Sequence, residues 1–453
     1  MLYSKQTNQL TSFDGHEYPR VLVIDHHPLT RQCVAGSVWC NLFQNWPTGT
    51  VSCVTSSSMS PAPGFAIPTW TVGQGRDVHQ GASRSTRSSR ASRIRAAAAR
   101  LCPTAVREWY GEKRARRHSV PSESLLTWVT ENRPQVGVSM LGSARMVCLV
   151  NQVSFRLNLP VIPYFQDDWP ETLYARSIVT RRLRAQLQRE LSTAIRRAGL
   201  AFVVCDAMAR EYGDRYGVAT EVIPNCVDSG EQAAVAEVPQ FSVSRPLRIV
   251  FAGNLYLGRP ALAIDVAQAV EQLVVGGARV EFRLYLGADD RQKYGPLLAR
   301  YAGTRLFDWV EPELLSATLR ECDIGLHIDD FSPSARSLIQ FSFGAKIPEY
   351  LMASLPILSY APSSYAVASM IRDRVLGVVV SERKIALVRA AISQLLADRQ
   401  RLVELKRRAR EEALGRFEPT MVRSRLRQAL LRASLGETRG FKSVFWKAKY
   451  AAD

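Results

Sequence analysis

Short apolar runs alternate with longer amphipathic stretches through the second half of the chain. Five of the runs are too continuous for a sheet with one wet face, so they indicate buried strands at 248–253, 280–287, 324–328, 355–360 and 377–380. Between them, apolar positions recur with a helical period and predict helices at 260–275, 290–301, 312–320, 345–353 and 382–397. Alternation of this kind builds a parallel sheet covered on both faces. We therefore expect a doubly wound α/β domain over residues 247–434.

The first half of the chain shows the same alternation with more interruptions. Its strand candidates lie at 19–25, 50–54, 135–140, 160–165, 201–205 and 220–224, and its clearest helices at 172–199 and 207–216. This pattern predicts a second Rossmann-like α/β domain over residues 1–229. Periodicity then fades around Ser-Gly and Ser-Arg-Pro, which indicates a linker at 230–246.

The composition is that of a globular protein. The chain has 453 residues, of which 46% are hydrophobic, and this favours two domains and excludes a collagen-like or disordered chain. Eight cysteines without any C-x-x-C spacing favour buried, reduced thiols over a zinc site or a disulfide framework. Neither a signal-peptide core nor a run of about eighteen apolar residues is present. We expect a cytoplasmic protein, with a peripheral position on the inner face of the cell membrane left open.

The charge of the chain favours an anionic partner. Lys and Arg outnumber Asp and Glu by 59 to 41, and half of the resulting excess of +18 lies in residues 83–117, inside an insertion near 55–117. Three interpretations stay open for this basic segment: a solvated insertion, an interfacial helix on anionic phospholipid, or a nucleic-acid site. Apolar residues such as Ile94 and Trp109 suit a lipid surface, although Pro103 interrupts any helix.

Two loops that follow predicted strands carry the chemistry of a nucleotide site. Ligands of open parallel sheets bind beyond the carboxyl ends of the strands. Gly253 allows a sharp turn there, and Arg259 stands at the start of the next helix, where a cation and free backbone N–H groups suit a diphosphate. Farther along, Gly344 precedes a helix that begins with Lys346 and Glu349. Lys346 suits a phosphate, and Glu349 suits the vicinal diol of a ribose.

Four segments in a fixed order carry a family resemblance: VIPNCVD (222–228), FAGNLYLGR (251–259), ECDIGLHI (321–328) and FGAKIPEYLMASLPIL (343–358). With them the chain resembles the GT-B glycosyltransferases, especially glycosyltransferase family 4, over most of residues 135–434. The resemblance implies two Rossmann-like domains that face each other across a cleft, with the nucleotide-sugar donor on the second domain and the acceptor on the first. It also implies a retaining transfer, with the departing phosphate near the incoming hydroxyl.

Several positions correspond to the donor-binding residues of that family. Glu349 matches the glutamate that holds the ribose, Arg259 stands at the lysine position, and Asn254 stands at the arginine position. Lys346 would be a second cation, while Phe341 takes the place of the family's first glutamate, whose contact with the sugar is lost or supplied elsewhere. The expected donor-binding set is Gly36, Gly253, Asn254, Arg259, Phe343, Gly344, Lys346 and Glu349.

The loop at 164–174 lies where the family often has His-Asp facing the cleft. Asp167 and Asp168 are therefore candidates for orienting the acceptor hydroxyl or taking its proton, because enclosure beside Trp169 can raise the pKa of a carboxyl group. The alternative is that an aspartate caps the helix that begins near Pro170. Together with Arg259, the two aspartates form the expected catalytic set.

The loop after the first strand, at 25–37, opens toward the same cleft in a GT-B fold. Gly36 would let backbone N–H groups approach the donor, and His26, His27 and Arg31 would meet the acceptor. For the adjacent histidines, solvent or packing roles are the alternative. The sequence lacks the Asp-x-Asp motif of the manganese-dependent GT-A design, so we expect no metal or other cofactor, with cations and helix dipoles neutralising the leaving group.

The expected function is glycosyl transfer from a nucleotide-sugar to a hydroxyl of a glycan or lipid-linked acceptor, in polysaccharide or glycoconjugate biosynthesis. Three alternatives stay open: a noncatalytic GT-B-like protein of an assembly complex that binds a nucleotide-sugar or a glycan, a nucleic-acid-binding protein, and a nucleotide-sugar epimerase. The helix at 416–433 and the tail at 435–453 resemble the segment that returns to the first domain in this family.

Overall fold

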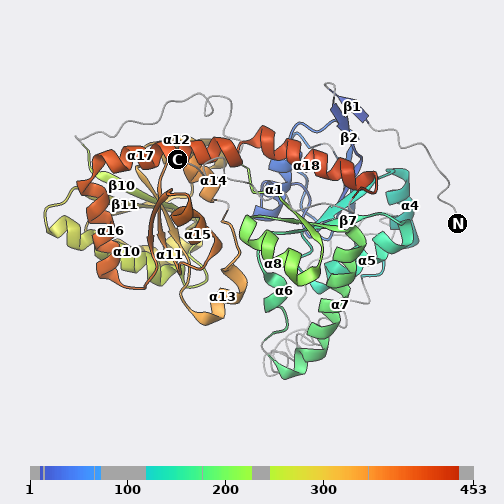
Figure 1. Cartoon of the computed structure of the whole chain (residues 1–453), viewed down its shortest axis with the longest axis horizontal. Coiled ribbons are helices and arrows are strands. Elements are labelled where there is room, and N and C mark those ends of the chain that lie inside the picture. Colours follow the sequence, from blue (N-terminus) through green and yellow to red (C-terminus); the bar gives the residue numbers. More distant parts are fainter. Residues whose placement is uncertain are drawn as a thin grey trace, which may run out of the picture. The chain divides into compact units, whose positions relative to one another are not determined.

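The computed structural model describes residues 11–13, 16–65, 67–72, 119–175, 177–226, 245–344 and 346–437. It divides into two compact units, which are Met1–Val222 with Arg425–Asp453 (unit 1) and Ile223–Ser424 (unit 2). Each unit has a central sheet with helices packed around it (Figure 1). The basic segment 83–117, residues 227–244 and the tail from residue 438 lie outside the described residues, as do the expectations made for them.

Unit 1 contains a seven-stranded sheet whose neighbouring strands all pair in parallel, in the order β5-β4-β3-β6-β7-β8-β9. The strands are β3 (Val21–Asp25), β4 (Val51–Thr55), β5 (Thr69–Thr71), β6 (Val136–Ser139), β7 (Val161–Phe165), β8 (Leu200–Val203) and β9 (Ala219–Val222). Six of them confirm the sequence prediction, and β3, β4, β6, β7 and β8 are buried along their whole length. A separate antiparallel pair is formed by β1 (Thr11–Phe13) and β2 (His16–Tyr18).

The helices of unit 1 follow capping and apolar spacing. They are α1 (Val34–Phe43), α4 (Glu123–Glu131), α5 (Ala144–Leu157), α6 (Trp169–Thr172), the 3₁₀ turn η1 (Ile178–Thr180), α7 (Arg181–Ala198) and α8 (Asp206–Tyr216). The single helix predicted at 172–199 is wrong at its start. Tyr174 has a φ of +60°, which a helix cannot contain, so α6 ends before it and α7 begins at Arg181.

Unit 2 contains a six-stranded parallel sheet in the order β12-β11-β10-β13-β14-β15. Its strands are β10 (Leu247–Ala252), β11 (Val280–Leu286), β12 (Thr304–Asp308), β13 (Ile324–Ile328), β14 (Ile357–Tyr360) and β15 (Gly377–Val380). The sequence predicts all of them except β12. This strand pairs only with β11 and has just one buried residue, so it lacks the apolar run that marks the others.

The helices of unit 2 cover its sheet and enclose a continuous apolar core built largely from β10, β11, β13 and α10. They are α10 (Arg259–Val275), α11 (Ala288–Leu298), α12 (Pro312–Arg320), α13 (Pro333–Ile339), α14 (Lys346–Met352), α15 (Ala366–Asp373), α16 (Ile385–Ala397) and α17 (Arg399–Arg416). The short helices α13 and α15 were not predicted, whereas the helix predicted at 312–320 has the observed bounds.

The last helix, α18 (Pro419–Ser434), begins in unit 2 and ends in unit 1. Its Arg425 guanidinium lies 3.4 Å from a carboxylate oxygen of Glu221 and donates to the carbonyl oxygen of Val222. Arg427 donates to the carbonyl oxygen of Glu17 and stacks over the ring of Tyr18. The second half of α18 is therefore part of unit 1.

Both sheets have a topological switch point, where the order of the strands reverses. It lies between β3 and β6 in unit 1 and between β10 and β13 in unit 2. Loops leave in opposite directions from the carboxyl ends of these strand pairs, and open α/β sheets bind their ligands there. The candidate residues after β3 and β10 thus stand where a parallel sheet offers a site.

Within the described part of the chain no disulfide forms, and five of the seven cysteines there are buried. Burial raises the pKa of the Cys322 thiol to about 11, and that of Cys40 likewise to about 11, which keeps these thiols protonated and unreactive. Among the same residues, no helix is both long enough and apolar enough to cross a bilayer.

Candidate functional site

The loop after β10 is shaped by two glycines. The Gly253 N–H donates to the carbonyl oxygen of Tyr285 at the end of β11, and Asn254 then leaves the sheet with an exposed side chain. Gly258, just before α10, has a φ of +79°, and a Cβ at this position would lie 2.5 Å from the carboxyl carbon of Asp330. Only glycine allows this turn, because a side chain would be both strained and in collision. The turn fixes where α10 begins.

Arg259 is the first residue of α10 and is held at the switch point of unit 2. Its Nε donates to the carbonyl oxygen of Ile328 at 3.0 Å, and its Nη2 lies 2.8 Å from Oδ1 of Asp329. Its guanidinium also stacks over the ring of Tyr256 at 4.8 Å. The contacts join the start of α10 to the carboxyl end of β13, and one carboxylate balances the charge of Arg259.

Asp329 has a second side-chain partner, since Nε2 of His327 lies 3.0 Å from its Oδ2. Burial opposes ionisation of Asp329, but His327 and Arg259 outweigh it and lower the pKa of this carboxyl group. The other ring nitrogen of His327 lies 3.1 Å from the hydroxyl of Ser359. This chain of contacts spans β13 and β14 and keeps the partner of Arg259 ionised.

Helix α14 brings Lys346 and Glu349 together. Nζ of Lys346 lies 2.9 Å from Oε2 of Glu349, one turn later, and 5.4 Å from the ring centre of Trp309. Burial raises the pKa of Glu349, while Lys346 partly opposes the rise. The next residue, Tyr350, has a fully buried ring, and its hydroxyl oxygen accepts a hydrogen bond from the Ala252 N–H at 3.1 Å. Helix α14 is thereby fastened to the carboxyl end of β10.

Phe343 and Gly344, in the loop before α14, differ from each other in environment. Phe343 is 4% exposed and stacks on Phe417 at 5.6 Å, so its ring belongs to the interior of unit 2. A Cβ at Gly344 would have no neighbour within 4 Å, so this residue lies in open space. The backbone at Gly344 is therefore accessible, whereas the side chain of Phe343 is committed to packing.

At the switch point of unit 1, His26 joins three strand ends. Its Nε2 lies 2.9 Å from the hydroxyl of Ser143 at the start of α5, and its Nδ1 lies 3.2 Å from the hydroxyl of Ser56 after β4. Burial lowers the pKa of His26, and neighbouring Asp25 opposes the shift. Asp25 is itself buried and accepts hydrogen bonds from Trp39 Nε1 at 2.7 Å and from the His26 N–H. His26 is thus a neutral, fully engaged side chain at ordinary pH.

The other candidates of this loop have separate surroundings. Nδ1 of His27 is buried and has no hydrogen-bond partner among the described residues, whereas Arg31 is exposed and its Nη1 lies 3.4 Å from Oδ1 of Asn41. Gly36 is buried, and a Cβ there would lie 2.4 Å from the carbonyl oxygen of Thr30. Its N–H already donates to the sulfur of Cys33. Glycine at position 36 is needed for close packing of the loop on α1.

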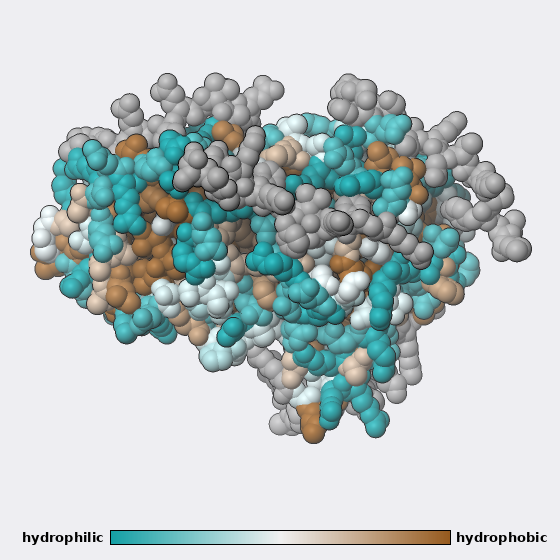
Figure 2. Space-filling view, viewed as in Figure 1, coloured by the Kyte–Doolittle hydropathy of each residue, from teal (hydrophilic) through white to brown (hydrophobic). Residues whose placement is uncertain are grey.

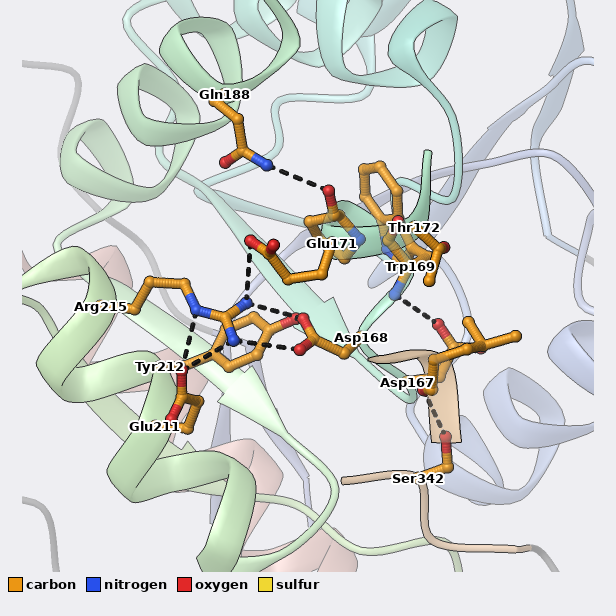
Figure 3. A network of polar contacts seen from close by, with 12 residues as sticks. Asp167, Asp168, Trp169, Glu171, Thr172, Gln188, Glu211, Tyr212, Arg215 and Ser342 are labelled. Atoms are coloured by element: carbon orange, nitrogen blue, oxygen red, sulfur yellow. Dashed lines mark hydrogen bonds and ion pairs between the residues drawn. The ribbon is translucent and has the colours of Figure 1, made fainter. Parts of the chain in front are cut away.

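The two aspartates after β7 have different environments (Figure 3). Asp168 has no exposed surface, and it forms a two-pronged ion pair with Arg215 at 2.7 and 3.0 Å and accepts a hydrogen bond from the Tyr212 hydroxyl at 2.8 Å. Oδ1 of Asp167 accepts the Trp169 N–H, and burial raises the pKa of this carboxyl group. Asp168 ties β7 to α8, and no side-chain capping bond forms at the start of α6.

Arg215 is the hub of this network. Its Nη2 also lies 2.7 Å from Glu211, and its Nη1 lies 3.7 Å from Glu171, which pairs with Arg184 of α7 at 2.7 Å. The network connects α6, α7 and α8 around the loop that carries Asp167 (Figure 3). A sequence search that looks only at strand ends misses Arg215, since it lies inside a helix.

The structure therefore gathers part of the expected set in each unit. In unit 2, Gly253, Asn254 and Arg259 share one loop, and Lys346 and Glu349 form a pair on a helix fastened to the same strand. Sequence reasoning missed Asp329, Tyr350 and Trp309. Asp329 directly follows a predicted strand, so the rule that singled out Arg259 also applied to it. Within the described residues, no group of three His, Cys, Asp or Glu side chains is placed to hold a metal ion.

Comparison with known proteins identifies the architecture. No family model matches the chain, and no curated protein matches it. Among solved structures, HepE of Anabaena in complex with UDP matches with a TM-score of 0.59 at 13% identity, over 91% of this chain and 99% of that one. The chain has the GT-B fold. Two further structures with this fold match at TM-scores of 0.53 and 0.57, with 13% and 12% identity.

The first of these two is WaaG, a glycosyltransferase involved in lipopolysaccharide biosynthesis, matched over 90% of this chain and 99% of that one. The second is sucrose-phosphate synthase from Thermosynechococcus elongatus, matched over 92% of this chain and 100% of that one. These matches cover nearly the full length of this chain and of the other two chains, so they include both sheets. At this level of identity the similarity establishes the fold alone, and the chemistry of the site depends on the residues of this chain.

Proposed function

We propose that the protein is a glycosyltransferase that moves a sugar from a nucleotide-sugar donor to a hydroxyl group of a glycan or lipid-linked acceptor. The observation that carries the proposal is the Lys346–Glu349 pair on α14, a helix fastened by Tyr350 to the strand end that leads to Arg259. Structures of HepE with UDP and with UDP-glucose show that a protein of this fold binds such donors.

Each end of a nucleotide diphosphate has a partner in this arrangement. Glu349 accepts hydrogen bonds from the two ribose hydroxyls. Because burial raises its pKa, its negative charge is stabilised when new hydrogen-bond donors arrive. Lys346 and Arg259 face the diphosphate, together with the N–H groups at the start of α10. Because Asp329 already balances Arg259, the diphosphate competes with that carboxylate for the guanidinium, and Lys346 supplies the less buried charge.

The transfer we propose is retaining and independent of metal. The bond from the anomeric carbon to the diphosphate oxygen breaks, a bond from the acceptor oxygen to that carbon forms on the same face, and the acceptor proton passes to the departing phosphate. The two cations and the helix dipole stabilise the negative charge that develops on the leaving group. Asp167 orients the acceptor hydroxyl, while the contacts of Asp168 support an anchoring role for that residue.

The acceptor side is proposed on unit 1, at the loop that holds His26, His27 and Arg31. Nδ1 of His27, which has no hydrogen-bond partner among the residues that the structure describes, and the exposed guanidinium of Arg31 provide hydrogen-bonding capacity there. A lipid-linked acceptor is consistent with a peripheral position at an anionic membrane, which is the role proposed for segment 83–117. A place in polysaccharide or glycoconjugate synthesis follows from such an acceptor.

The test measures release of nucleotide diphosphate from UDP-, GDP-, ADP- and dTDP-sugars, with and without a lipid extract and with and without a chelator. We expect release from one donor, stimulated by the extract and unaffected by the chelator. Glu349→Gln should lower the rate by roughly a hundredfold, because it weakens the hold on the ribose in the transition state.

Glu412→Gln is a matched control, since Glu412 also forms a half-buried ion pair, at 3.0 Å with Arg374, which lies just before the edge strand β15. Equal rates for both variants would contradict the donor site. Donor binding without release under every condition would favour the noncatalytic alternative. Conversion of the donor sugar without any acceptor would favour an epimerase.

A further inference from the structure

A small apolar tip stands out on the surface of unit 1. Ile178 is 85% exposed and Val179 is 49% exposed, side by side in the turn η1. Thr180 behind them is fully buried, and its hydroxyl donates to the carbonyl oxygens of Tyr174 and Ser177. The turn is thus anchored from within while it presents two large apolar side chains to water.

The helix that follows the tip is strongly basic. Helix α7 contains six arginines and one glutamate, and it buries leucines at every fourth position on one side. Arg182, Arg189 and Arg196 are spaced by seven residues, or two turns, so they project from the opposite side as a row that we call the arginine ridge. None of the three forms an ion pair with a described residue. Figure 2 shows a hydrophilic strip at the lower end of unit 1 that finishes in a brown, apolar tip.

Helix α17 provides a contrast within the same chain, because it is also rich in arginine but pairs two of its exposed arginines with glutamates of the same helix. Arg407 and Arg408 both pair with Glu404 at 2.7 Å, and Arg407 pairs with Glu411 as well. Such i,i+3 and i,i+4 pairs are the ordinary way in which a surface helix carries many charges. The arginine ridge of α7 keeps its positive charge available for a partner from outside the chain.

We propose that Ile178–Arg182, the α7 tip, docks with the arginine ridge onto an anionic phospholipid bilayer. The two apolar side chains enter the boundary between headgroups and acyl chains, and the arginines bind the phosphates around them. A nucleic acid would use the arginines but would leave Ile178 and Val179 without a partner. This surface goes beyond the proposed function, is separate from segment 83–117, and does not require catalysis.

The experiment is co-sedimentation of the full chain with vesicles of phosphatidylcholine, either pure or mixed with phosphatidylglycerol. We expect binding to the mixed vesicles only, which weakens as salt is raised. Ile178→Ser/Val179→Ser should weaken binding at least about tenfold, because the apolar area no longer leaves water. Arg182→Gln/Arg189→Gln/Arg196→Gln should weaken it by roughly fivefold for each arginine at the surface and reduce its dependence on salt.

The control is Val275→Ser/Val403→Ser, which removes two side chains that are 80% and 52% exposed in unit 2. The proposal is overturned if the tip variant and the control variant bind vesicles equally, or if the full chain does not bind anionic vesicles. It is also overturned if deletion of residues 83–117 abolishes vesicle binding while the tip variant keeps it. Binding to duplex DNA that is lost only in the arginine variant would also overturn it. Nucleotide diphosphate release without vesicles should be the same in the tip variant, so failure here is distinguishable from failure of the proposed function.

Discussion

Asp167 and Asp168 are neighbours of the same type, yet their surroundings give them different properties. Asp168 has an arginine and a phenol as partners for its oxygens, so its negative charge is stabilised inside the protein. Burial removes water from Asp167, and the hydrogen bond from the Trp169 N–H offsets this loss only in part, so its charge is destabilised. A carboxylate of the first kind holds structure together, and one of the second kind is available for chemistry.

For Asp168→Asn we expect a loss of about 3 kcal/mol in the free energy of unfolding, because Arg215 would lose its bidentate partner inside the protein. Denaturant titration of the full chain measures this loss. Glu123→Gln serves as control, since its ion pair with Arg156 is exposed and should contribute less than about 1 kcal/mol. A loss no larger than that of the control would refute the anchoring role.

For Asp167→Asn we expect a more stable but less active protein. Burial raises the pKa of Asp167 in the folded state, so folding favours the protonated form and wild-type stability falls as pH rises from the unfolded value of about 3.9 through the raised value. The variant lacks this fall and should melt higher at neutral pH, with the difference vanishing toward acid. Thermal unfolding across this range and nucleotide diphosphate release provide both readouts. A constant difference in melting temperature at every pH would contradict the assignment.

Among elements, the start of β13 is fixed by a buried charge cluster. Asp323 precedes the strand with no exposed surface, and it accepts hydrogen bonds from Arg245 at 2.6 and 2.9 Å and from Lys406 of α17 at 3.1 Å. Lys406 is only 1% exposed. The carboxylate of Asp323 therefore connects the segment before β10, the start of β13 and helix α17.

We expect Asp323→Ala to cost about 3–5 kcal/mol, because two cations would be left without their partner in the interior. Lys406→Met should cost much less, since Asp323 keeps Arg245 and the methionine fills the same space with apolar atoms. Chemical denaturation of both variants tests the order. A larger loss for the lysine variant would show that packing of α17, and not the carboxylate, dominates.

The elements also show how far sequence reasoning reaches. Buried strands such as β10 and β13 were predicted because apolar runs mark them, whereas the edge strand β12 was missed because only one of its five residues is buried. The strand-end rule found Arg259, but its pairing with Asp329 depends on which strands are neighbours in the sheet. The partnership of Asp168 with Arg215, 47 residues later, likewise exists only through the packing of α8.

For the whole molecule, positive charge is distributed unevenly among the helices. The chain carries a net charge of +18, yet Arg407 and Arg408 of α17 pair with glutamates of their own helix, whereas the arginine ridge of α7 forms no ion pair with a described residue. A positive protein surface gains long-range attraction to anionic partners from such unbalanced stretches. The parallel sheets, in contrast, consist mainly of buried apolar strands such as β3 and β13, and they place polar loops at the carboxyl ends of those strands.

Because α18 ends in unit 1, synthesis of unit 1 begins before that of unit 2 and is completed only after it. Glu221 emerges about 200 residues before its partner Arg425, which at typical synthesis rates is a delay of roughly 10–40 s. During that interval unit 1 lacks a helix, while all of unit 2 is being made. Unit 1 is then an incomplete sheet domain that has to stay soluble. A chaperone that binds it would act during this interval.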